Sequence, residues 1–63
     1  MPTIDMEAAR ARYEEALRRF EEASAVISAH LAARTLPTES ELLQEEHARS
    51  DLVEARHVLW SLF

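Results

Sequence analysis

"TLPTESEL", from Thr35 to Leu42, divides the chain into two parts. Pro37 disfavours the helical conformation for the residue before it, so a helix that approaches this stretch should end ahead of the proline. Thr38 and Glu41 have the spacing T-x-x-E, a capping box, in which each side chain satisfies a free backbone N–H at the start of a helix. The stretch therefore predicts the end of one helix, a short turn, and the start of a second helix.

The two helices are expected at about 5–34 and about 39–62, with the turn at about 35–38. Thr3 or Asp5 can cap the first helix through a side-chain oxygen. The 63 residues include no glycine, which tight β-turns usually require, and are rich in good helix formers. A turn of a few residues brings successive helices back antiparallel. We therefore predict an all-α fold, a single antiparallel two-helix hairpin.

The first helix carries one broad apolar face. Large apolar residues recur every seven positions, and alanines with the same spacing lie on the flank of that face. We therefore expect a neighbouring helix to approach closely along the line of alanines, while the large side chains pack into holes along a second line. The large residues are Met6, Tyr13, Phe20 and Ile27, joined by Leu17 and Leu31, and the alanines are Ala9, Ala16 and Ala23.

The second helix carries two apolar stripes. Ala48, Leu52, Ala55, Leu59 and Leu62 form a stripe that suffices to face the first helix. About 100° away lies another stripe, with two arginines between them. This second stripe is Leu42, Val53 and Trp60, and the arginines are Arg49 and Arg56.

A hairpin needs only one apolar face per helix, so the second stripe requires another surface to cover it. We expect two hairpins to pair as a homodimeric four-helix bundle, with parallel and antiparallel pairing both open. The C-terminal sequence "VLWSLF" is the strongest candidate contact, either within the dimer or with another protein. The expected interface residues are Tyr13, Leu17, Phe20, Ile27, Leu42, Val53, Trp60 and Phe63.

Enzymatic sites are not indicated. Glu54 and His57 have the Glu-x-x-His spacing of di-iron bundles, but this pair lies away from the stripe that faces the first helix and should face water. No Ser/His/Asp or Cys/His set can be assembled, and no glycine is present for a phosphate-binding loop. We expect no catalytic residue, cofactor or metal.

The histidines favour structural roles. His47 and Asp51 form an i, i+4 pair on the outer side of the second helix. His30 lies near the turn, where an antiparallel return brings Glu41 or Glu45 close. We expect a structural hydrogen bond from His30, while a ligand-binding or pH-responsive role stays open.

Two alternative functions involve nucleic acid. A hairpin dimer of this length resembles the repressor-of-primer type of RNA-binding bundle in size and architecture, although no motif residues are shared. Trp60 beside Arg49 and Arg56 could stack a base, but Arg56 and Trp60 at i, i+4 more simply form a cation–π pair. Alternatively, the acidic second helix could imitate nucleic acid and inhibit a protein that binds it.

Composition limits the remaining classes of function. The formal net charge of −5 disfavours nonspecific attraction to nucleic acid or anionic lipid. No uninterrupted apolar stretch is long enough to span a membrane, and acids interrupt the N-terminal region where a signal peptide would be apolar. The absence of cysteine fits a reducing compartment. We predict a non-catalytic cytoplasmic protein that acts through protein–protein interaction, with a regulatory or adaptor role.

Overall fold

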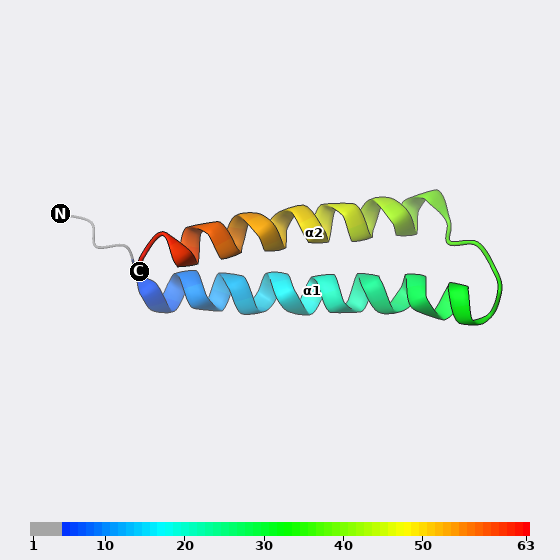
Figure 1. Cartoon of the computed structure of the whole chain (residues 1–63), viewed down its shortest axis with the longest axis horizontal. Coiled ribbons are helices and arrows are strands. Elements are labelled where there is room, and N and C mark those ends of the chain that lie inside the picture. The colour runs from blue at the N-terminus through cyan, green and yellow to red at the C-terminus, as the bar shows by residue number, and fades with distance from the viewer. Residues whose placement is uncertain (1–4) are drawn as a thin grey trace.

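The computed structural model describes residues 5–63 as two helices, α1 (Met6–Ala32) and α2 (Glu39–Trp60). The helices pack side by side in opposite directions, and the C-terminal end lies beside the start of α1 (Figure 1). The predicted all-α antiparallel hairpin is therefore confirmed. Each helix ends two residues earlier than the sequence suggested, and the connection between them is correspondingly longer.

Both helix starts are capped by side chains. The Asp5 carboxylate accepts a hydrogen bond from the backbone N–H of Glu7 at 3.0 Å, while Thr3, the other candidate cap, lies outside the described residues. At α2 the predicted capping box is present in both directions. The Thr38 N–H donates to Glu41 Oε1 at 2.8 Å, and the Glu41 N–H donates to Thr38 Oγ1 at 3.1 Å.

Arg34 ends α1 in an unexpected conformation. Its φ of 59° lies in the left-handed region, where a side chain is disfavoured and glycine is the usual residue. The Arg34 N–H donates to the Leu31 carbonyl at 3.1 Å, and the Thr35 N–H donates to the His30 carbonyl at 2.9 Å. These bonds satisfy carbonyls at the helix end, and α1 therefore stops before Arg34, which the sequence had placed within the helix.

The contact between the helices is built from small side chains. Ala9, Ala16 and Ala55 are buried, Ala55 with 1% of its surface exposed, and no larger side chain is buried among residues 5–63. Ala23 is half-buried in the same seven-residue series as Ala9 and Ala16. We call this line of alanines the alanine seam. It is the alanine flank of α1, and not the centre of its large apolar residues, that turns toward α2.

The hairpin is a thin rod. Its principal-axis extents are 52 × 16 × 14 Å and its radius of gyration is 14.7 Å, whereas a compact domain of this length has a radius of gyration of about 11 Å. Two helices that contact each other through alanine cannot surround large side chains on all sides, so they do not form a core of large residues. Large side chains therefore lie on the sides of the rod.

The alanine seam makes a prediction for packing. Ala55→Leu should lower the free energy of unfolding by about 1–3 kcal/mol, because the larger side chain has no space between the helices. Denaturant titration at fixed protein concentration measures the change. Ala11→Leu is the matched control, since Ala11 is exposed on α1 and leucine is also a good helix former. Equal effects of the two substitutions would contradict the close packing at Ala55.

Candidate functional site

One side of the hairpin is polar. Arg12 Nη2 and Glu54 Oε2 lie 3.8 Å apart and form an ion pair between the helices on this side. The same side holds the residues that line the grooves between α1 and α2. We call it the polar face, and its charged and polar members are Arg12, Glu15, Arg19, Glu22, Gln44, His47, Asp51 and Glu54.

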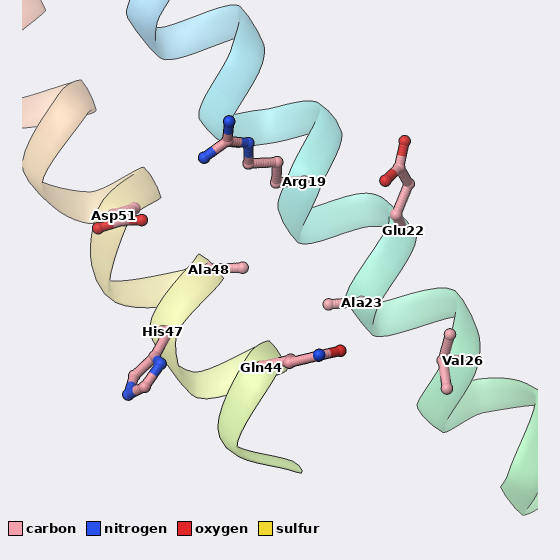
Figure 2. A pocket seen from close by; sticks show the side chains of 8 residues that line it. All are labelled: Arg19, Glu22, Ala23, Val26, Gln44, His47, Ala48 and Asp51. Atoms are coloured by element: carbon pink, nitrogen blue, oxygen red, sulfur yellow. The ribbon is translucent and has the colours of Figure 1, made fainter. Parts of the chain in front are cut away.

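The larger groove on the polar face has a volume of about 440 Å³. Ala23 and Ala48 point toward one another across it, and their small size leaves the groove open (Figure 2). Arg19 extends toward α2, while His47 points away from α1 (Figure 2). His47 and Asp51 both line this groove, and no ion pair between them is found in residues 5–63. Asp51 also lines the smaller groove with Ala16, so it faces the space between the helices and not the outer side of α2 that the sequence suggested.

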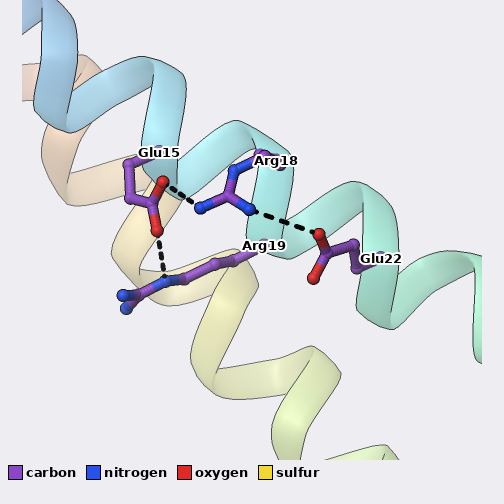
Figure 3. A network of polar contacts seen from close by, with 4 residues as sticks. All are labelled: Glu15, Arg18, Arg19 and Glu22. Carbon is purple, nitrogen blue, oxygen red and sulfur yellow. Dashed lines mark hydrogen bonds and ion pairs between the residues drawn. The ribbon is translucent and has the colours of Figure 1, made fainter.

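A network of ion pairs neutralises much of the polar face on α1 (Figure 3). The Glu15 carboxylate accepts hydrogen bonds from Arg18 and, at 3.0 Å, from Arg19. Arg18 Nη1 also lies 3.6 Å from Glu22 Oε1. The Arg18 guanidinium, with help from Arg19, holds the pKa of Glu15 below its ordinary value. The expected i, i+4 pair of Glu15 and Arg19 is confirmed.

The opposite side of the hairpin is apolar. On α1, Tyr13, Leu17 and Phe20 are rotated about 60° from the alanine seam, in the sense opposite to Arg12 and Arg19. On α2, the second stripe is rotated much further, about 150° from Ala55 in the sense opposite to Glu54, so it lies near the outer side of α2. Both apolar sets are turned away from the polar face, but the α1 set lies beside the alanine seam, whereas the α2 set lies at the outer edge of the rod beyond Arg49 and Arg56. We call the two sets together the apolar face. This apolar face consists of Met6, Tyr13, Leu17, Phe20 and Leu31 from α1 and Leu42, Val53 and Trp60 from α2.

The apolar face is poorly covered by the hairpin itself. Trp60 is 65% exposed, and Leu42 and Val53 are about half exposed, whereas Tyr13, Leu17 and Phe20 are half-buried beside the alanine seam. These six are residues that the sequence singled out as an interface. Of the other two, Phe63 is 85% exposed beyond the end of α2. Ile27 is half-buried and lies five helical turns from Ala9, so it faces α2.

The two arginines within the apolar face are held differently. Arg49 Nη2 donates to Glu45 Oε2 at 2.7 Å, one helical turn away. The guanidinium carbon of Arg56 lies 5.5 Å from the centre of the Trp60 ring, which confirms the expected cation–π pair. Among residues 5–63, Arg56 is the one helix arginine without a carboxylate within 4.0 Å.

At the turn, His30 joins the two helices. Its Nε2 lies 2.9 Å from Glu41 Oε1, and its Nδ1 lies 2.9 Å from Thr35 Oγ1. Because a carboxylate only accepts hydrogen bonds, Nε2 carries the hydrogen in this contact. The predicted hydrogen bond from His30 to a carboxylate is confirmed, with Glu41 as the acceptor. The additional contact with Thr35 was not anticipated. We call His30, Thr35, Thr38 and Glu41 the turn latch.

Comparisons of the chain with protein-family models, with curated proteins and with solved structures found no match. The functional argument therefore starts from the geometry of the two faces.

Three sequence expectations about metal sites, the Glu-x-x-His pair and membrane spans concern the part of the chain that the structure describes. Residues 5–63 contain no group of three His, Cys, Asp or Glu placed to hold a metal ion. Glu54 pairs with Arg12, and His57 is exposed, so this Glu-x-x-His pair faces solvent as expected. Neither α1 nor α2 is long and apolar enough to cross a membrane.

Sequence reasoning missed the groove and the Arg12–Glu54 pair. Both depend on which residues of α1 and α2 lie at the same level, and a periodic pattern within one helix does not contain that information. The facing alanines Ala23 and Ala48 were the available signal for the groove, since two small residues opposite each other leave space.

The turn latch makes a prediction for pH dependence. The Thr38 backbone N–H, with contributions from the Thr38 hydroxyl and His30, lowers the pKa of Glu41. A lowered pKa in the folded state stabilises the protein above the unfolded pKa, and this contribution is lost as the pH falls through the folded pKa. Glu41→Gln, which retains a cap acceptor, should therefore be less stable than wild type at pH 6 and similar to it near pH 3.

Urea titrations of wild type and the Gln variant across this range measure the difference. Glu39→Gln is the control, because Glu39 lies in the same first turn but has no side-chain bond among those found in residues 5–63. A stability difference between Glu41→Gln and wild type that is the same at pH 3 and pH 6 would contradict the role of the Glu41 charge.

Proposed function

We propose that this chain is a non-catalytic interaction protein that self-associates through its apolar face into a four-helix bundle. The observation that carries the proposal is the absence of any buried side chain larger than alanine among residues 5–63, together with the large apolar residues of the apolar face that the hairpin leaves exposed. In stable domains such residues fill a core. Pairing two apolar faces would supply that core.

The solvent-accessible area of the chain is larger than that of a compact monomer of its mass, as expected if part of this surface is covered by a partner. The chain exposes 5150 Å², whereas a compact folded monomer of this mass exposes about 4,100 Å². The excess, about 1,000 Å², is comparable with the roughly 800 Å² that each partner buries in a standard protein–protein interface. One interface of ordinary size would therefore bring the hairpin close to the exposed area of a compact protein.

The proposed biological role is that of a small regulatory or adaptor protein in the cytoplasm. The lack of cysteine fits a reducing compartment, and the exposed aromatic residues Trp60 and Phe63 are of the kind enriched at binding hot spots. RNA binding is less well supported. Five of the six helix arginines pair with glutamate and Arg56 stacks on Trp60, so no unpaired basic stripe supports phosphate contacts.

Two valines provide a matched test. Val53 is 49% exposed on the apolar face, and Val26 is 41% exposed beside the groove on the polar face. Val53→Glu should weaken self-association by about 2 kcal/mol or more, roughly 30-fold in the dissociation constant, because pairing would bury the new charge. Val26→Glu makes the same chemical change on the other side and should leave the dissociation constant within a few-fold of wild type.

Sedimentation equilibrium across a range of concentrations measures both variants against wild type. A wild-type chain that remains a well-folded monomer at high micromolar concentration would refute the proposal. Equal weakening by the two substitutions would place the interface elsewhere.

A further inference from the structure

We infer that the second copy lies antiparallel to the first, with its turn at the free end of its partner, and that Arg56 of each copy pairs with Glu46 of the other. The inference rests on the proposed self-association and specifies its geometry. The arguments are the distribution of side-chain size along the apolar face, the unpaired charges on α2, and a shared midpoint of two residue pairs.

Side-chain size changes along the apolar face. The free end of the hairpin carries Met6, Tyr13 and Trp60, with Phe63 beyond them. The turn end carries only the leucines Leu31 and Leu42. A parallel dimer would crowd the bulky residues of both copies at one end and leave the other end thin. An antiparallel dimer places bulky residues against leucines at both ends, so the separation of the hairpins stays even and the packing dense.

The unpaired charges on α2 are placed for the same arrangement. Arg49 is already satisfied by Glu45 within its own helix. Arg56 has no carboxylate within 4.0 Å, and Glu46, whose charge also acts on Arg49, forms no ion pair within 4.0 Å among the described residues. In a parallel dimer the Arg56 side chains of the two copies would lie at the same level, with like charges near each other. In the antiparallel dimer Arg56 can reach Glu46 of the second copy.

A single two-fold axis satisfies both arguments. The positions midway between Arg56 and Glu46 and midway between Trp60 and Leu42 are the same residue, Asp51. An axis at the level of Asp51 lies near the middle of α2 and aligns both pairs at once. Asp51 also lines a groove with Ala16 of α1, so Leu17 lies at about this level and would pack against its own copy beside the axis.

Spin labels measure the orientation. The chain has no cysteine, so single-cysteine variants can be labelled without background. Ser28 is exposed on α1, about ten residues from the level of the axis, so labels on Ser28→Cys should lie more than about 30 Å apart in the antiparallel dimer. In a parallel dimer they would lie at the same level and about 20 Å apart or less. Double electron–electron resonance on the intact protein distinguishes these distances.

A second label separates failure of the orientation from failure of the dimer. Ser50 is exposed and neighbours Asp51, so labels on Ser50→Cys lie at the level of the proposed axis and should be separated only across the thickness of the dimer, giving a distance below about 30 Å in either dimer. A short distance at Ser50 with a long distance at Ser28 supports the antiparallel arrangement. Short distances at both positions overturn the orientation but keep the self-association. No coupling between copies at either position overturns the self-association itself.

Charge exchange tests the Arg56–Glu46 pair. Arg56→Glu and Glu46→Arg should each weaken the dimer about 10-fold, because each places like charges together, and the double variant should recover most of the loss. The loss of the Arg56–Trp60 contact is common to the single and double Arg56 variants, so recovery reports the pairing alone. Additive weakening in the double variant, measured by sedimentation, would overturn the pair.

Discussion

The rest of this structure depends on the close approach of two helices through alanine. Ala9, Ala16 and Ala55 bring the backbones together but remove little apolar surface from water, since each side chain is a single methyl group. The large residues are consequently displaced around the helices, where they are half-buried or exposed. A hairpin built in this way holds its helices in register without a buried core of large side chains among residues 5–63.

The charged residues reinforce the difference between the two sides. Most ion pairs are exposed, and exposed pairs contribute little to stability because water screens them and long side chains lose entropy. Their main effect is to keep the polar face hydrated. The Glu15 network and the Arg12–Glu54 pair occupy that face beside the exposed Val26.

Much of the architecture could be predicted from the sequence because its signals are local. Asp5, Thr38 and Glu41 act within one helical turn, and the apolar stripes follow from helical periodicity. The left-handed Arg34 could not be predicted, since a chain without glycine must place another residue there and propensity does not say which. The rotation of α1 was also undetermined. Its alanines and its large residues are about 60° apart, and only packing against α2 decides between them.

The turn latch has a consequence for the route by which the molecule folds. Glu41 Oε1 lies within hydrogen-bonding distance of both the start of α2 and the last turn of α1, through residues only 11 positions apart in the sequence. Contacts of short sequence separation close with little loss of chain entropy and form early. The free end, where Arg12 meets Glu54 across most of the chain, closes later. Each hairpin is thus expected to form from its turn toward its free end. If the chain self-associates as proposed, the encounter of two preformed hairpins would be the concentration-dependent step.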